Sequence, residues 1–355
     1  MIKNVYLCGR LCESRWRVKP GSAPNVAQKL DIQNPFEVME KSLKRFLNVG
    51  LLTGLVLSFG FTSCSSDDDG DDSAISDRGG SAAVINGKRL VAIVEGNDTV
   101  RYEYNSAGQI VKVTDGDDEE NYVYEDTKIT YTQSGSSSSR VYLLTNGRIT
   151  EETRVSSNSS SSTPTRRFTY DADGQLVKVT YSRTDENSYS SSYTYKTEET
   201  QTEEYTWADG NVVMSVAKDE SKTTTTSTSS EWDYYSQTYK PVTETSWTSW
   251  SSTSKGTFTY SEHANTLPFF GMGSDEVLAW QGYFGKSLRQ MPSRVVREYT
   301  SSSASSDGSS NSGDPTNTIY TYDYTIENGV VTKFIEQTTG QGDRARTTII
   351  NLVWQ

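Results

Sequence analysis

Cysteine and histidine are scarce in this sequence. Among its 355 residues, cysteine occurs only at Cys8, Cys12 and Cys64, and His263 is the single histidine. A chain that keeps one thiol from Cys64 onward has no partner for a disulfide and no set of thiolates for a metal. One imidazole excludes a histidine-rich metal site, and no G-x-S-x-G motif supplies a nucleophilic serine for it. We therefore expect a structural or solvent-exposed role for His263, with no metal site and no catalytic triad.

Nucleotide-binding motifs are also missing. The segment GYFGKS from Gly282 has Trp280 where a phosphate-binding loop needs its first glycine. Gly271 and Gly273 are followed by Glu276, which stands where a dinucleotide-binding motif needs a third glycine. Basic residues are in the minority, because the net charge is −12 and the part after residue 63 has 25 basic against 42 acidic residues. We expect no cofactor, no nucleotide and no nucleic-acid partner.

An export signal is present near the N-terminus. Lys41, Lys44 and Arg45 precede an apolar run over residues 46–61, and Thr-Ser follows directly before Cys64. This order of charged, apolar and small residues is typical of a secretory signal. The run is shorter than the roughly 20 residues that a transmembrane helix needs. We predict a cleaved lipoprotein signal peptide over residues 39–63, with Met39 as the true start and residues 1–38 as a gene-model artefact.

The Thr62-Ser63-Cys64 end resembles a lipobox, although Phe61 departs from the usual leucine. This resemblance implies that the Cys64 thiol is acylated and that the protein is held by outer-membrane lipid without a spanning segment. The alternative is an ordinary signal peptide with an incidental cysteine.

Acidic residues follow the cysteine at once, in the run SSDDDGDD. The run resembles a surface-export tag of some Gram-negative anaerobes, which implies the outward leaflet of the outer membrane. The alternative is a solvated linker over residues 64–83 that holds the folded domain off the bilayer. Two short motifs, at Ser73 and Thr99, resemble O-glycosylation sequons. The residues of the tag are Asp67, Asp68, Asp69, Asp71 and Asp72.

Tyrosine is abundant, and it recurs within a repeated unit. The chain has 22 Tyr and 7 Trp, although only 33% of its residues are hydrophobic. RYEYNSAGQIVKVTDG from Arg101 and RRFTYDADGQLVKVTYS from Arg166 are the clearest copies of a Tyr-x-Tyr strand, a glycine turn and an alternating strand. This pattern predicts β-hairpins. Weaker copies place their turns at Gly87, Gly147, Gly210 and Gly329.

Serine- and threonine-rich tracts separate these units, and we interpret them as long loops at the opposite end of the sheet. They start at Ser134, Ser156, Lys222 and Ser301. The expected fold is all-β, an antiparallel up-and-down meander that forms a curved sheet or open barrel, as one repetitive domain over residues 84–355. Strands such as KITYTQ place polar residues where a lipid-facing band would lie, so we expect no membrane-inserted barrel.

An apolar insert over residues 263–296 interrupts the repeats. Ser274 or Asp275 can cap the start of a short helix, and Gly282 or Gly285 can end it. The spacing places Val277, Trp280 and Phe284 on one face. We expect this helix to pack on the concave side of the sheet.

The hairpins, the NTLPFFG turn and the segment GYFGKSLRQMPSRV together resemble a family of gut-bacterial lipoproteins of unknown function with a porin-like fold. This resemblance covers most of residues 84–355. The hairpin units are also similar to the tyrosine-aspartate repeats of Rhs-type shells, best at Tyr170-Asp171 with Gly174, whereas the other good copy has Asn105. Neither resemblance implies an enzymatic activity.

Tryptophans are the candidate ligand-binding residues, because an indole ring can stack on the apolar face of a sugar. The candidates are Trp207, Trp232, Trp247 and Trp250, and their alternative role is cross-strand packing. Trp247 and Trp250 are three residues apart, so they must point to opposite faces of a strand.

The leading hypothesis is a non-catalytic surface lipoprotein that binds a glycan, a lipid or a host protein. One alternative is a structural envelope scaffold or adhesin-like component. The other is a carboxylate-based hydrolase, which requires two buried acids with raised pKa in one pocket.

Overall fold

The structure is a computed structural model that describes residues 55–56, 84–156, 164–190, 192–267, 270–271, 273–340 and 345–355. Almost all of these residues lie in antiparallel strands. The elements are β1 (Leu55–Val56), β2 (Val84–Ile85), β3 (Lys88–Glu95), β4 (Asp98–Tyr104), β5 (Ile110–Asp115), β6 (Asp118–Tyr124), β7 (Lys128–Gln133), β8 (Ser138–Thr145), β9 (Arg148–Ser156), β10 (Thr165–Tyr170), β11 (Leu176–Ser190), β12 (Tyr193–Ala208), β13 (Asn211–Asp233), β14 (Thr238–Ala264), β15 (Phe270–Gly271), α2 (Glu276–Trp280), β16 (Gln290–Ser305), β17 (Ser310–Ser312), β18 (Thr316–Glu327), β19 (Val330–Gly340) and β20 (Arg346–Trp354).

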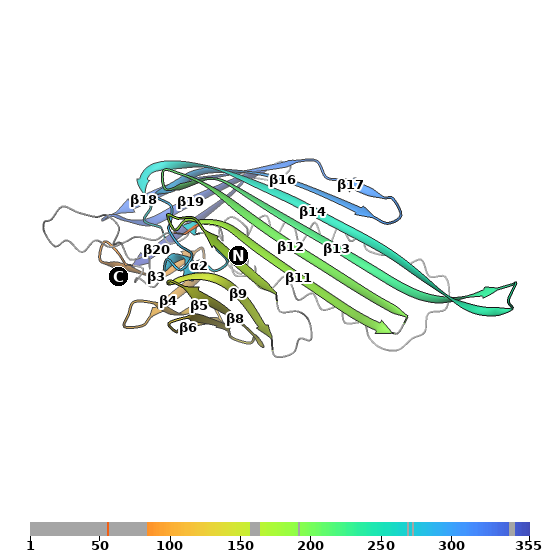
Figure 1. Ribbon diagram of the computed structural model, residues 1–355. Coiled ribbons are helices and arrows are strands. Elements are labelled where there is room, and N and C mark those ends of the chain that lie inside the picture. Colours follow the sequence, from red (N-terminus) through yellow and green to blue (C-terminus); the bar gives the residue numbers. More distant parts are fainter. Residues whose placement is uncertain are drawn as a thin grey trace.

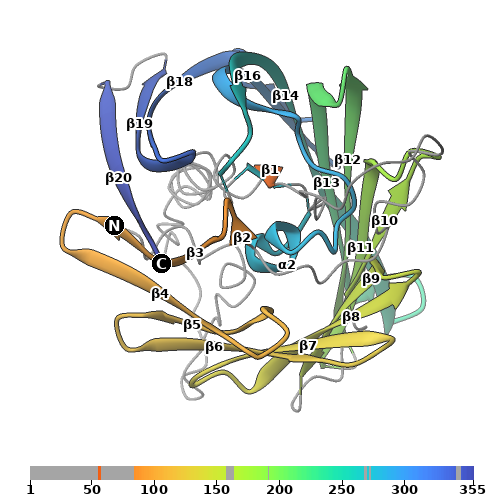
Figure 2. The same cartoon turned by 90° about the vertical axis from the view of Figure 1, so that its left-hand side faces the viewer.

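The strands form a closed barrel of 16 strands, viewed along its axis in Figure 2. Each long strand pairs with the next one along the chain, and β20 returns to pair with β3 at Asn351↔Val94 and Leu352↔Ile93. The predicted all-β up-and-down meander with one short helix inside is confirmed. The sheet is closed rather than open, because the pairing of β20 with β3 removes both edges.

Tight turns join the strands at one end of the barrel, as the repeated unit predicts. The φ angles of Gly87, Gly147, Gly210 and Gly329 are all positive, at 74–76°. Each glycine follows an Asn or Asp that also has positive φ, which is the pattern of a two-residue type I′ hairpin. These four predicted turns are confirmed, and we call this end of the barrel the tight-turn end.

The second aromatic residue of the repeat has a constant role at the tight-turn end. The hydroxyl of Tyr104 donates to the carbonyl of Leu90 at 2.6 Å, and the hydroxyl of Tyr170 donates to the carbonyl of Ile149 at 2.6 Å. An equivalent hydrogen bond recurs around the barrel. In each case an aromatic side chain near the end of one strand donates to a backbone carbonyl near the start of the preceding strand, and we call these the recurring aromatic bonds. Their donors are Tyr104, Tyr124, Tyr170, Trp207, Tyr260, Tyr324 and Trp354.

Two of the serine- and threonine-rich tracts are strands, which corrects the expectation of loops. The tract from Lys222 lies within β13, and the tract from Ser301 continues β16 before its turn. Threonine favours the pleated surface of a strand, and facing hydroxyls form cross-strand pairs such as Thr197 with Thr223 at 3.1 Å. The polar composition of these tracts indicates contact with solvent, but it does not exclude strand structure.

One hairpin extends far beyond the rest of the barrel (Figure 1). β14 has 27 residues, which corresponds to roughly 90 Å of chain at about 3.3 Å per residue. Pairing between β12 and β13 stops at Tyr193↔Ser227, and pairing between β14 and β16 stops at Thr248↔Ser305. Residues 228–243 are therefore two-stranded, and together with residues 244–247 of β14 they form the projection that we call the arm.

The outward face of the wall is polar on the long strands. Alternate residues of β11–β14 face outward, and they are mainly serine, threonine, lysine and glutamate. Lys178 on β11 pairs with Glu204 on β12 at 2.7 Å on this face, and both side chains are exposed to solvent. Large exposed aliphatic residues such as Val123 and Leu143 are scattered over other strands. Among the described residues, no helix has the length and hydropathy needed to span a membrane.

Candidate functional site

The part of the apolar insert from α2 to Leu288 lies inside the barrel, where it fills the tight-turn end (Figure 2). The predicted bounds of the insert were too wide, because residues 290–296 belong to the wall strand β16. α2 begins after Asp275, whose carboxylate accepts a hydrogen bond from the amide of Leu278 at 3.0 Å, so the predicted N-cap is confirmed. The helix ends at Trp280, and Gly282 follows with φ of 78°. Val277 and Trp280 are buried on the helix, whereas Phe284 is buried just after it.

Aromatic contacts hold the insert against several strands of the wall. The ring of Trp280 meets Tyr102 of β4 edge to face, with 5.4 Å between the centroids. Further along the insert, Phe284 packs on Phe168 of β10 at 4.9 Å. Backbone bonds add to this, since the amide of Ile149 donates to the carbonyl of Tyr283 at 2.8 Å. The insert thus contacts wall strands from different parts of the chain.

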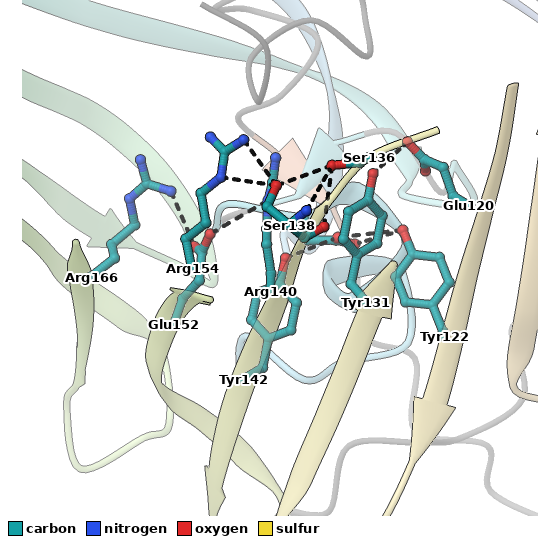
Figure 3. Close-up of polar contacts among 11 residues, drawn as sticks. Glu120, Tyr122, Tyr131, Ser136, Ser138, Arg140, Tyr142, Glu152, Arg154 and Arg166 are labelled. Carbon is teal, nitrogen blue, oxygen red and sulfur yellow. Dashed lines mark hydrogen bonds and ion pairs between the residues drawn. The ribbon is translucent and has the colours of Figure 1, made fainter. Parts of the chain in front are cut away.

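A cluster of polar side chains surrounds the start of α2 (Figure 3). The buried carboxylate of Asp275 accepts hydrogen bonds from the hydroxyls of Tyr142 at 3.1 Å and Tyr122 at 3.3 Å. Burial raises the pKa of the Asp275 carboxyl, although its hydrogen bonds from Leu278 and Tyr142 favour the ionised form. One carboxylate therefore caps the helix and joins it to β6 and β8.

Two further acids near Asp275 have raised pKa values. Burial and the charge of Asp275 raise the pKa of Glu120 to about 7, while a hydrogen bond from the Tyr131 hydroxyl at 2.9 Å limits the rise. Burial and the charges of Asp275 and Glu120 raise the pKa of Glu276 to about 8. We call Glu120, Asp275 and Glu276 the acid cluster. Its members are placed so that full ionisation near neutral pH is unfavourable.

Arginines neutralise a fourth acid beside the acid cluster. The buried carboxylate of Glu152 lies 3.1 Å from Arg166 and 3.9 Å from Arg140. Burial opposes the ionisation of Glu152, but the two guanidinium groups hold its pKa below its ordinary value. Next to it, the guanidinium of Arg154 donates to Ser138 at 3.1 Å. Figure 3 shows these side chains converging from neighbouring strands of the wall.

The acid cluster consists of carboxyl groups that burial and mutual charge make harder to ionise. Three acids have the raised pKa that the hydrolase hypothesis requires, and that hypothesis also needs two of them to share one pocket. Yet Asp275 already accepts from one amide and two hydroxyls, so it is occupied in holding the insert. No group of three or more His, Cys, Asp or Glu side chains suits a metal ion in the described part of the chain. His263 is exposed.

The structure places the four candidate tryptophans in different surroundings. Trp207 donates to the carbonyl of Leu176 at 2.9 Å as part of the recurring aromatic bonds. Trp247 pairs with Thr224 and lies under the Lys222 ammonium at 5.6 Å. Trp250 is opposite Ser221 in the ladder, and the odd spacing puts it on the other face. Trp232 lies in the arm and is exposed.

Other predicted site residues fall on the N-terminal part. Cys64, Ser73 and the acidic tag Asp67, Asp68, Asp69, Asp71 and Asp72 lie outside the described residues. Thr99 is the second residue of β4 and is half-buried.

Two groups of residues were missed at the sequence level. Glu120 lies in the run DGDDEEN, which resembles any solvated acidic turn, so only the closed fold reveals its burial. Tyr234, Tyr235 and Tyr239 form an exposed patch with Trp232, and the dense spacing of DYYSQTY was the available signal.

Comparison with known proteins finds likenesses among solved structures. A porin-like protein from Bacteroides uniformis matches with a TM-score of 0.43 and 16% identity, covering 76% of this chain and 95% of that one. A porin-like protein from Bacteroides vulgatus matches with a TM-score of 0.33 and 11% identity, covering 75% and 98%. No protein-family model and no curated protein matches the chain. These likenesses concern fold alone, and the barrel assignment rests on the strand pairing described above.

Proposed function

We propose that this chain is a lipid-anchored protein on the outer face of an outer membrane, where its barrel binds a ligand without catalysing a reaction. The observation that supports it best is the polar outward face of β11–β14, with Lys178 and Glu204 paired in solvent. A wall inside a bilayer needs an apolar band on its outward positions. The proposed anchor at Cys64 supplies membrane attachment without such a band.

The filled tight-turn end supports a binding role over an open channel. Phe284, Trp280 and the capped α2 fill the lumen at this end, and backbone bonds fix them to the wall. The barrel is thus a rigid support, which presents its opposite end and its arm to the surroundings.

The anchor is tested by Cys64→Ala in a Gram-negative host, with Ser66→Ala two residues further on as the control. We expect Cys64→Ala to abolish palmitate labelling and to release the protein from membranes, whereas Ser66→Ala leaves both unchanged. A Cys64→Ala protein that remains in the membrane pellet after a carbonate wash would show an inserted barrel and refute the proposal.

Exposure at the surface is tested separately through the acidic tag. Replacing Asp67, Asp68 and Asp69 with Ala is expected to protect the protein from external protease in intact cells, while the palmitate label is retained. If the protease digests the variant and the wild type equally, the acidic run acts as a linker, and its proposed role in export is refuted.

A carboxylate-based hydrolase is the second candidate, and the raised pKa values of Glu120 and Glu276 favour it. It predicts hydrolysis of an aryl glycoside panel by the wild type and loss of that activity in Glu120→Gln. Absence of turnover by the folded wild-type protein would refute this candidate.

A further inference from the structure

The end of the arm carries four exposed aromatic residues. Relative to the fully exposed residue, the accessible surface is 45% for Trp232, 85% for Tyr234, 102% for Tyr235 and 70% for Tyr239. We call these residues the aromatic tip. They lie at the extreme end of the β13–β14 hairpin, away from the rest of the molecule (Figure 1). Aromatic surface in water is unfavourable, and nothing in the barrel wall covers it.

The tip has a defined local structure. Trp232 and Tyr239 face each other across the hairpin, edge to face, with 5.1 Å between their centroids. In the turn, Asp233 accepts hydrogen bonds from the amide of Tyr235 at 2.9 Å and from the hydroxyl of Ser236 at 2.9 Å, and it pairs with Lys240. These contacts fix the turn that presents Tyr234 and Tyr235. A fixed aromatic surface loses little conformational entropy when it binds a ligand.

The composition of the arm indicates a polar ligand. Residues 228–247 contain eight serines and threonines, while Val242 is their only aliphatic residue other than proline. Aromatic rings stack on the apolar face of a sugar ring, and the surrounding hydroxyls can bond to those of the sugar. A lipid-binding surface would instead require aliphatic residues beside the aromatic ones.

The net charge of the arm and the size of its aromatic surface restrict the class of ligand further. The arm has three acidic residues and one lysine, so its net charge is −2, which disfavours anionic lipids and acidic polymers. Four aromatic residues on a two-stranded ribbon are also far fewer than the roughly 20–30 residues that each partner contributes to a standard protein interface. A few rings of a neutral polysaccharide match this surface.

The position of the aromatic tip agrees with a ligand outside the cell, if the protein is anchored through Cys64 as proposed above. The described domain begins at Val84, where β2 lies at the tight-turn end, whereas β13 starts there at Asn211 and runs 23 residues to the tip. That strand corresponds to roughly 75 Å of chain at about 3.3 Å per residue. A protein anchored through Cys64 thus points its tip away from its own membrane.

We propose that the aromatic tip of the β13–β14 arm is a binding site for a neutral polysaccharide, with Tyr234, Tyr235 and Trp232 stacking on its sugar rings.

Affinity electrophoresis of the full chain in mild detergent tests this, in gels that contain dextran, mannan, xylan or galactan. At least one of these is expected to retard the wild type, and Tyr234→Ala/Tyr235→Ala should weaken that retardation at least 10-fold. The matched control is Val123→Ala, which removes an exposed apolar side chain from β6 and should bind as the wild type does. Tryptophan fluorescence should change on binding, and Trp232→Phe should remove most of that change.

Several results would overturn the proposal. Mobility unaffected by all four polysaccharides, or equal retardation of the Tyr234/Tyr235 double variant, would do so. Tip-dependent pelleting with phosphatidylcholine vesicles would show a lipid ligand instead, and tip-dependent dimers in sedimentation would show a second copy. Because binding is measured in solution, its failure is distinct from failure of the Cys64 anchor, which is read from palmitate labelling.

Discussion

The hydroxyl of Tyr142 donates a hydrogen bond to the carboxylate of Asp275 at 3.1 Å, across 133 residues of sequence. Tyr142 is fully buried on β8, and Asp275 is the residue that caps α2. This bond couples the local stability of a five-residue helix to the wall of the barrel. A helix this short has little stability of its own, so tertiary contacts must hold it.

Replacing Asp275 with alanine should therefore be costly. The change removes a helix cap and leaves two buried tyrosine hydroxyls without their acceptor, so we expect a loss of about 3 kcal/mol in the free energy of unfolding. Asp323→Ala on β18, where the side chain is exposed, is the matched control and should cost less than about 0.5 kcal/mol. Urea unfolding measures both. Equal stabilities would show that the cap does not hold the insert.

The acid cluster predicts that the protein is more stable at pH 5 than at pH 8. The pKa of Glu120 is raised to about 7 in the folded state, so the folded form holds a proton that the unfolded form releases above about pH 4.5. Stability should fall by on the order of 2 kcal/mol between pH 5 and pH 8, at about 1.4 kcal/mol per unit of pKa. Glu276 adds a loss in the same direction up to about pH 8.

Glu120→Gln is the variant that checks this sign. An amide keeps the shape of the side chain but does not ionise, so the variant should be more stable than the wild type at pH 8 and should depend less on pH. Glu152 acts in the opposite direction, because its lowered pKa contributes stability that is lost as the pH falls through its folded-state value. Thermal melts at pH 5 and pH 8 measure the difference. A wild type that is equally stable at both values contradicts the prediction.

Close packing at a single glycine gives a third prediction. A Cβ added at Gly285 would lie 2.4 Å from the carbonyl oxygen of Gly174 and 2.9 Å from the ring of Tyr170. Gly308 has nearly the same φ, 86° against 87°, but a Cβ there meets nothing within 4 Å. Both alanine variants carry the same backbone strain, so the difference between their free energies of unfolding reports the steric clash between the insert and the wall. We expect Gly285→Ala to cost at least about 2 kcal/mol more than Gly308→Ala in urea unfolding. Equal costs would mean that the insert can shift.

Local features of the fold were predictable from the sequence, because they depend on neighbouring residues. The turns at Gly87 and Gly210 follow from an Asn-Gly and an Asp-Gly pair, and the cap at Asp275 follows from its place before an apolar helical run. Closure of the barrel depends on β20 meeting β3, some 260 residues apart in the chain, and no local pattern encodes that pairing.

The candidate site was harder to predict for a related reason. Glu120 and Glu276 are ordinary surface-like residues in sequence, and their raised pKa values arise from burial beside Asp275 in the closed barrel. The length of β13 was hidden by the threonines around Thr224, which are polar like a loop but pair as a strand. Polarity alone cannot separate these two cases.

The recurring aromatic bonds give a final prediction, on the stability of the tight-turn end. Tyr104→Phe keeps the half-buried ring but removes the hydroxyl that donates to Leu90, so it should cost about 1 kcal/mol in the free energy of unfolding. Tyr235→Phe makes the same chemical change on a fully exposed ring and should be neutral within about 0.5 kcal/mol. The bond from Tyr260 to Val212 lies on different strands, so the losses in a Tyr104→Phe/Tyr260→Phe double variant should add within about 0.5 kcal/mol. Urea unfolding of the wild type, the single variants Tyr104→Phe, Tyr260→Phe and Tyr235→Phe, and the double variant measures all of these differences. If Tyr104→Phe does not change the free energy of unfolding, the ring of the repeated tyrosine stabilises the fold and its hydroxyl does not.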